Sequence, residues 1–217
     1  MAFDILDEHE QGELVRQWLR ENAISIAVGV LLGLGLIFGW QQWRVHRLHR
    51  NAEAAAQYQA LVGALDAHRN DDADKLADAL RKDYSNTAYA IFAAMRQADQ
   101  SSSNGDLKAA AADLSWAHEH ADGSAMKALS ALRLARVTLA EGDANAAIKL
   151  LDTMPKDAYP GLAAELRGDA SAKLGRTDDA RTAYQNALTH FDPQAPESNF
   201  VQMKLDDLPS VKQAQRS

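Results

Sequence analysis

Cysteine is absent from the 217-residue chain. Without thiols the protein has no disulfide framework, no zinc ribbon, no thiolate-bound iron–sulfur cluster and no cysteine nucleophile. Five prolines and twelve glycines are too few for a disordered or fibrous chain. Acidic residues outnumber Lys and Arg by 30 to 23, and the net charge of -7 argues against a general nucleic-acid binder.

The motifs that mark common enzyme classes are missing as well. No P-loop, Rossmann glycine pattern, nucleophile elbow or HExxH sequence occurs. His118 and His120 stand two residues apart, and on a helix such positions point in different directions, which disfavours a shared metal ion. We therefore expect no enzyme, no catalytic or metal site and no cofactor.

Charged residues are also missing from one long stretch. The 22 residues from Asn22 to Trp43 contain none, and as a helix they would reach about 33 Å, enough to cross a hydrocarbon core of ~30 Å. A cleavable signal peptide would begin with basic residues and have a shorter apolar run. Here the first 21 residues are acidic. The sequence predicts a retained transmembrane helix at residues 23–43.

The flanks and glycines of this helix suggest how it sits in a bilayer. Interfacial anchors are expected at its exit, where indole rings and guanidinium groups favour the lipid headgroups: Trp40, Trp43, Arg44 and Arg47. Two glycine pairs spaced four apart would let a second helix approach closely: Gly29 with Gly33, and Gly35 with Gly39. Glycine is frequent in membrane helices generally, so a packing role for these pairs stays open.

The orientation of the helix does not follow from its flanking charges. Arg16, Arg20 and the amino terminus lie on one side, and Arg44, Arg47 and Arg50 lie on the other. The two flanks carry nearly equal numbers of positive charges, so the positive-inside rule does not predict which flank faces the cytoplasm. A domain on the cytoplasmic side, serving as a scaffold that tethers a soluble partner, therefore remains the alternative to a domain on the outer side.

Beyond the span, the composition and spacing of apolar residues predict an all-α solenoid of antiparallel helix pairs. Aligning Gly105, Gly142 and Gly175 gives spacings of 37 and 33, which bracket the 34 of a tetratricopeptide repeat. The alignment also matches small or apolar residues at three further positions: Ala98, Ala135 and Gly168; Ala110, Ala147 and Ala180; Ala117, Met154 and Ala187.

The predicted organisation has five parts. They are a short acidic cytoplasmic segment (1–22), the transmembrane helix (23–43), a juxtamembrane helix with a first, atypical helix pair (44–90), three tetratricopeptide-like repeats (91–193), and a capping segment with a flexible tail (194–217).

A repeat array of this kind binds peptides or helices in a groove lined by its first helices. Placing the usual groove positions on this alignment gives eleven candidate partner-binding residues: Phe92, Met95, Asp99, Leu129, Leu132, Arg136, Leu139, Leu162, Glu165, Asp169 and Lys173. Some of these leucines are expected to belong to the core instead.

Several segments, taken in order, resemble a known family. They are residues 16–22 (RQWLREN), 39–43 (GWQQW), 132–137 (LRLARV), 166–168 (LRG), 175–181 (GRTDDAR) and 202–208 (QMKLDDL). Together with the acidic head, the single span and the degenerate repeats, they resemble the ancillary SecYEG translocon subunits, or YfgM-like proteins. Residues 51–83 match least.

The resemblance implies a bacterial inner-membrane protein with a cytoplasmic amino terminus and a periplasmic repeat domain. It implies association with the SecYEG channel and with a membrane-anchored periplasmic chaperone of the PpiD type. It further implies assistance to newly exported client polypeptides and a link to envelope stress signalling. No nucleic-acid partner is expected.

Overall fold

The computed structural model describes residues 8–209, which form helices and connecting loops without a single strand. The expected all-α class is confirmed. The helices are α1 (Glu8–Asp66), α2 (Asn70–Asp83), α3 (Ala88–Ser103), α4 (Leu107–His120), α5 (Ser124–Glu141), α6 (Ala144–Asp152), α7 (Pro160–Lys173), α8 (Thr177–His190) and α9 (Pro196–Asp206). The predicted flexible tail beyond Pro209 and the first seven residues of the acidic segment lie outside this range.

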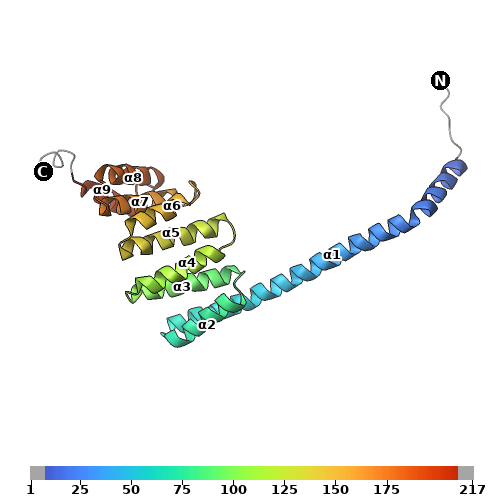
Figure 1. The fold of residues 1–217 in the computed structure, drawn as a ribbon, viewed down its shortest axis with the longest axis horizontal. Helices are drawn as coiled ribbons and strands as arrows, with labels where there is room; N and C mark the ends of the chain where they lie inside the picture. The colour runs from blue at the N-terminus through green and yellow to red at the C-terminus, as the bar shows by residue number, and fades with distance from the viewer. Residues whose placement is uncertain (1–7, 210–217) are drawn as a thin grey trace, which may run out of the picture. The chain divides into compact units, whose positions relative to one another are not determined.

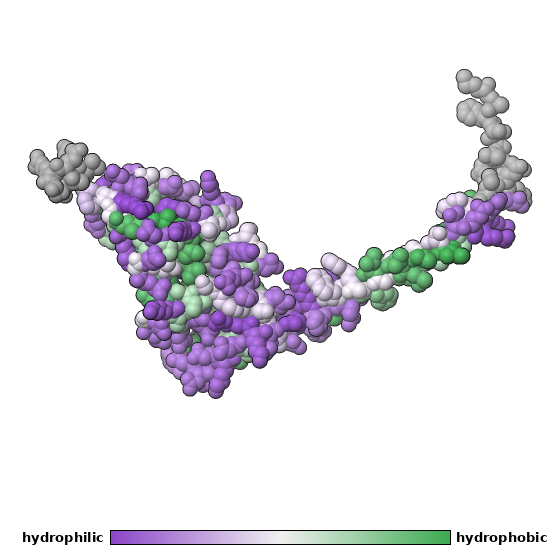
Figure 2. Space-filling model, in the orientation of Figure 1, coloured by the Kyte–Doolittle hydropathy of each residue, from purple (hydrophilic) through white to green (hydrophobic). Residues whose placement is uncertain are grey.

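The chain divides into two compact units, Met1–Arg50 and Asn51–Ser217, and α1 contributes residues to both. In the first unit, α1 carries a continuous band of apolar side chains (Figure 2). None of its most apolar stretch is buried. Within the described residues it is the one helix that is long and apolar enough to cross a membrane. An apolar surface of this size calls for a nonpolar environment.

In the second unit, successive helices pack as antiparallel neighbours: α3 with α4, α5 with α6, and α7 with α8 (Figure 1). The three glycines that align in the sequence end the first helix of each pair, with φ of +82° at Gly105, +109° at Gly142 and +73° at Gly175. Glycine adopts this left-handed conformation without a steric penalty, which explains its recurrence. Asp106 and Asp143 then cap the following helices, because each side-chain oxygen accepts a hydrogen bond from the backbone amide three residues further along.

Small residues bring the two helices of a pair together. Ala98 and Ala135 are buried, and a Cβ added at Gly168 would lie 2.5 Å from Cδ1 of Tyr184. The aligned Ala110, Ala147 and Ala180 are fully buried on the second helices. The apolar core is consequently alanine-rich and divides into clusters that follow one another along the stack.

Helix α9 covers the last pair. Val201 is fully buried among Ala180, Tyr184 and Ala187 of α8, and Leu205 packs against the same cluster. Without α9 this apolar face of α8 would be open to water, because no later helix pair exists in the described chain to stack on it.

Candidate functional site

The first helices of successive pairs lie side by side and present a shared surface, which we call the first-helix face: residues 51–66 of α1, with α3, α5 and α7. Arg133 of α5 forms an ion pair with Asp99 of α3, at 3.2 Å from Nη1 to Oδ2. Lys173 of α7 donates a 2.8 Å hydrogen bond from Nζ to the carbonyl of Leu139 at the end of α5. These contacts link three consecutive pairs across the face.

Aromatic rings gather at the α3 end of this face. The Tyr58 ring lies 5.9 Å from that of Tyr89 and 6.1 Å from that of Phe92, between ring centroids. Phe92 is half-buried, Met95 is buried in the core at 3% exposure, and Asp99 is exposed. Of the three candidates on α3, Phe92 and Asp99 therefore retain accessible side chains.

The candidates on α5 divide in the same way. Leu132 and Leu139 are buried in the core between α5, α6 and α7, and Leu129 packs half-buried against the neighbouring cluster. Arg136 is exposed. The apolar candidates thus hold α5 in place, while the cation faces outward.

The candidates on α7 are already engaged by the last helix. Lys204 of α9 donates to Glu165 Oε1 at 2.7 Å and to Asp169 Oδ2 at 2.8 Å. Leu162 packs against the core, and Lys173 stays exposed. The two carboxylates therefore hold α9 against α7, a contact that the repeat alignment did not reveal.

This contact changes the protonation equilibria of its members. Burial lowers the pKa of Lys204, but hydrogen bonds to Asp169 and Glu165 outweigh this effect, and the pKa lies above its ordinary value. Burial raises the pKa of Tyr184, whose hydroxyl donates to Asp169 Oδ1 at 2.8 Å, and this bond raises it further. At neutral pH the group is one ammonium, one neutral phenol and two carboxyl side chains.

The accessible candidates can recognise a partner, but nothing in their arrangement resembles catalytic machinery. Phe92 offers an apolar contact, Asp99 an anion, and Arg136 and Lys173 two cations. Across residues 8–209 no group of three or more His, Asp or Glu side chains is placed to hold a metal ion. Apolar anchors beside charged groups are typical of surfaces that bind polypeptides.

The candidates in the first unit are all on the surface of α1. No atom lies within 4 Å of a Cβ added at Gly29, Gly33, Gly35 or Gly39, so both glycine pairs are open to a neighbouring helix. At the end of the apolar stretch the rings of Trp40 and Trp43 lie 5.3 Å apart. Arg47 Cζ stands 5.4 Å from the Trp43 ring centroid, and Arg44 is exposed beside them.

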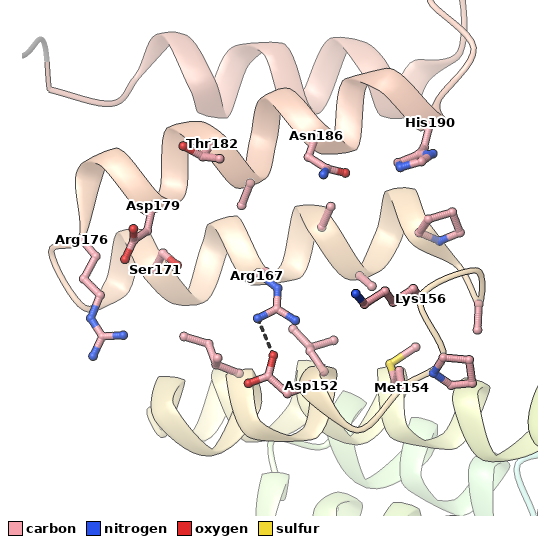
Figure 3. Close-up of a pocket in the computed structure, with 18 residues that line it drawn as sticks. Asp152, Met154, Lys156, Arg167, Ser171, Arg176, Asp179, Thr182, Asn186 and His190 are labelled. Carbon is pink, nitrogen blue, oxygen red and sulfur yellow. Dashed lines mark hydrogen bonds and ion pairs between the residues drawn. The ribbon is translucent and has the colours of Figure 1, made fainter.

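Two cavities lie away from the candidate residues, and sequence reasoning did not identify them. The larger, of about 680 Å³, is bounded by α6, α7 and α8 (Figure 3). It uses Ala163, Arg167 and Ser171 of α7, on the side of that helix opposite to Glu165 and Asp169. The smaller, of about 550 Å³, is bounded by α4, α5 and α6.

Known proteins resemble the chain over nearly its whole length. The model of the tetratricopeptide repeat-like domain family matches residues 16–210. A protein of Escherichia coli (strain K12) is 33% identical over 202 residues, which are 93% of this chain and 97% of the relative. A protein of Haemophilus influenzae (strain ATCC 51907 / DSM 11121 / KW20 / Rd) is 30% identical over 96% of this chain and all of its own. Both relatives bear the name ancillary SecYEG translocon subunit, which denotes no enzyme.

Proposed function

The chain belongs to the tetratricopeptide repeat-like domain family and to the ancillary SecYEG translocon subunits, and we propose that it is a membrane-anchored protein-interaction module of the export machinery. Its partners are the SecYEG translocon, a membrane-anchored periplasmic chaperone of the PpiD type, and exported client polypeptides. It acts by recognition and not by catalysis. The observation that carries this proposal is the 33% identity to a translocon subunit over 97% of that relative.

Residues 23–43 anchor the protein in the bacterial inner membrane in a single pass. The exposed apolar surface of α1 supports this, because water is a poor environment for it. Trp40, Trp43, Arg44 and Arg47 lie in the headgroup region. The open glycine pairs, Gly29 with Gly33 and Gly35 with Gly39, provide a surface on which a partner's membrane helix packs closely.

The amino terminus faces the cytoplasm and the repeat domain faces the periplasm. A cysteine-free domain suits that oxidising compartment, because it has no thiol to be oxidised. A position beside newly exported chains would also connect the protein to envelope stress signalling, since unfolded clients accumulate there.

The first-helix face is the partner-binding site of the repeat domain. Phe92, Asp99, Arg136 and Lys173 contact the partner directly, because their side chains remain accessible. The buried Met95, Leu132 and Leu139, together with the half-buried Leu129 and Leu162, set the spacing of the three helices. Glu165 and Asp169 act indirectly, by holding α9.

Anchoring matters energetically because the protein and its partner are already held in the same membrane. Binding of the repeat domain to that partner then resembles an intramolecular step. A domain confined to the same membrane as its partner meets it at an effective concentration that can reach the millimolar range. Weak contacts on the first-helix face then suffice. A mixed surface with few exposed apolar side chains fits this requirement better than it fits tight binding in solution.

Co-purification from native membranes tests the association. The full-length protein should recover SecYEG subunits, and replacing residues 23–43 with an unrelated apolar span should reduce that recovery several-fold while membrane attachment is kept. A second variant, Arg136→Glu with the native span, separates the contribution of the repeat domain. Recovery that both variants leave unchanged would refute the proposal.

A reporter fused after Ser217 tests the orientation. Alkaline phosphatase should be active there, and green fluorescent protein exported by the same route should stay dark. The reverse result would place the repeat domain in the cytoplasm, where it would act as a scaffold for a soluble partner.

A further inference from the structure

The repeat alignment identifies equivalent positions at three junctions, each formed by the second helix of one pair and both helices of the next. The first junction joins α2, α3 and α4, the second α4, α5 and α6, and the third α6, α7 and α8. The same glycine spacings of 37 and 33 that define the repeats assign the equivalents. They are Gln97, Leu134 and Arg167; Asp113, Leu150 and Ala183; Trp116, Thr153 and Asn186; and His120, Asp157 and His190.

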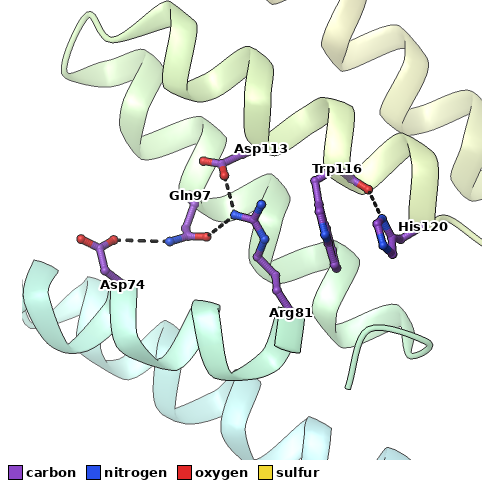
Figure 4. A network of polar contacts seen from close by, with 6 residues as sticks. All are labelled: Asp74, Arg81, Gln97, Asp113, Trp116 and His120. Atoms are coloured by element: carbon purple, nitrogen blue, oxygen red, sulfur yellow. Dashed lines mark hydrogen bonds and ion pairs between the residues drawn. The ribbon is translucent and has the colours of Figure 1, made fainter. Parts of the chain in front are cut away.

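The chain's own side chains fill the first junction (Figure 4). Arg81 Nη1 bonds to Asp113 Oδ1 at 2.6 Å, and its guanidinium carbon stands 4.8 Å from the Trp116 ring centroid. The His120 ring stacks on Trp116 with 4.2 Å between centroids. The indole also packs against the core clusters on both sides of the junction. A single aromatic side chain, flanked by a guanidinium and an imidazole, thus makes the core continuous here.

An aliphatic side chain performs the same task at the second junction. Leu150, equivalent to Asp113, packs against the clusters on both sides. Thr153 stands where Trp116 stands in the first junction and leaves the cavity of about 550 Å³. Leu134 forms part of its lining. The apolar core is therefore continuous across this junction as well.

At the third junction the described residues form no apolar bridge. Ala183 and Asn186 replace Asp113 and Trp116, and no apolar side chain of residues 8–209 packs against the core clusters on both sides. The ion pair between Arg167 of α7 and Asp152 of α6 crosses the junction instead. The cavity of about 680 Å³ occupies the space, with Arg167 and His190 at its margin (Figure 3). Its volume falls within the ~300–1,000 Å³ of small-ligand sites. His190 is the aligned counterpart of His120, and Arg167, which aligns with Gln97, places a guanidinium at the cavity in a role like that of Arg81, but no ring of the described residues lies between them.

The charged residues that line the cavity favour one kind of charged group on a ligand. Asp152 holds Arg167 in place at 2.7 Å. Within residues 8–209, Lys156 and Arg176 have no ion pair with a carboxylate, and Asp179 is the other anion of the lining. Lys156 and His190 lie toward the same end of the cavity (Figure 3). That end favours a carboxylate on the ligand.

We propose that the third junction is a binding site for an aromatic side chain of a partner protein, presented next to an acidic residue. The ring occupies the place that Trp116 occupies in the first junction, between Arg167 and His190, and the neighbouring carboxylate pairs with Lys156. The site lies on the side of α7 opposite to the first-helix face. It goes beyond the proposed function and does not depend on it.

Methyl NMR on the full-length protein in lipid nanodiscs tests the site. Of the five methionines, Met154 lines the cavity, whereas Met95 and Met126 pack against a different core cluster. The probe is acetyl-Gly-Asp-Trp-Gly-amide, and empty nanodiscs correct for its partition into lipid. It should shift the methyl resonance of Met154 and leave that of Met95 in place. The peptide with Ala for Trp should bind at least about tenfold more weakly.

Two variants on α8 form a matched pair. Asn186→Trp places an indole in the cavity from within, so it should retain the melting temperature and lose peptide binding. Gln185→Trp adds the same residue at an exposed position outside the lining, so it should bind as the wild type does. Peptide binding by a folded N186W protein, or equal affinity for the Trp and Ala peptides, would overturn the proposal.

Lys156→Gln tests the carboxylate contact independently of the cavity's shape. Lys156 is exposed, so this variant keeps the fold. It should bind the Asp-containing probe several-fold more weakly and bind the probe with Gln in place of Asp as the wild type does. Unchanged affinity for the Asp-containing probe would contradict the assigned charge selection.

Discussion

Replacing Lys204 by Met should destabilise the repeat domain through its last helix. The substitution keeps the length and apolar stem of the side chain but removes the ammonium that pairs with Glu165 at 2.7 Å and Asp169 at 2.8 Å. Two partly buried carboxylates then face each other without a cation. Both carboxylates belong to α7, so they repel each other within that helix, while the attraction that held α9 to α7 is lost and the apolar cover that α9 gives to α8 loosens.

The magnitude follows from the exposure of the three side chains, which is 32% for Lys204, 18% for Glu165 and 27% for Asp169. Breaking a fully buried ion pair costs about 3–5 kcal/mol, whereas an exposed pair contributes ~0–1. Discounted for solvent screening, the expected loss is about 2 kcal/mol. For a domain of this size, that loss lowers the melting temperature by roughly 4–8 °C.

The assay is thermal unfolding followed by circular dichroism in nanodiscs, with Lys108→Ala as the control at an exposed lysine. In a background carrying Glu165→Gln and Asp169→Asn, Lys204→Met should cost much less, because no carboxylates are left unpaired. Because the pKa of folded Lys204 is raised above 10.5, its contribution is complete below that pH and is lost as pH rises through the folded value. An equal cost in both backgrounds would refute the electrostatic explanation.

Three further predictions concern the repeat domain. The pKa of Tyr184 is raised in the folded protein, so above pH 10 only the unfolded phenol ionises and the stability of the wild type should fall. Tyr184→Phe should flatten that fall in melting curves recorded from pH 9 to 11. Gly175→Ala, at φ +73°, should lower the free energy of unfolding by about 1 kcal/mol. Gly63→Ala, inside α1 with open space around its Cβ position, should raise it by about 0.5–1 kcal/mol. Equal effects of the two variants would contradict the helix-end role of Gly175. Arg136→Glu should leave the melting temperature unchanged and weaken partner recovery several-fold; a loss of stability instead would mark Arg136 as structural.

The repeat arrangement could be predicted from the sequence because its signals are local. A glycine that ends a helix in the left-handed conformation, followed by a capping Asp, needs only neighbouring residues, as at Gly105 with Asp106 and Gly142 with Asp143. The membrane-spanning segment could likewise be predicted from composition alone, because the run from Asn22 to Trp43 contains no charged residue.

The accessibility of the candidate residues could not be predicted in the same way. Leu132 and Arg136 stand four apart on one helical stripe, yet one is buried and the other exposed. Depth on such a stripe depends on the neighbouring helix, which sequence spacing does not specify. Glu165 and Asp169 meet Lys204 from 39 and 35 residues away, and no local pattern announces that pairing.

The cavity at the third junction was hidden for a related reason. In the alignment, Ala183 and Asn186 occupy the positions of Asp113 and Trp116. A smaller residue indicates an open space only if the larger side chain at the equivalent position points into the core, and the sequence does not give that direction. The structure supplies that direction, because Trp116 packs against the core clusters on both sides of the first junction.

Photocrosslinking in living cells tests most directly whether the anchored first-helix face holds export partners. A benzophenone amino acid at Arg136 of the full-length protein should give adducts with SecYEG subunits or with a membrane-anchored periplasmic chaperone. The same group at Lys108, exposed at the start of α4, should give few or none. Identical adducts at both positions, or none at Arg136, would contradict recognition through this face.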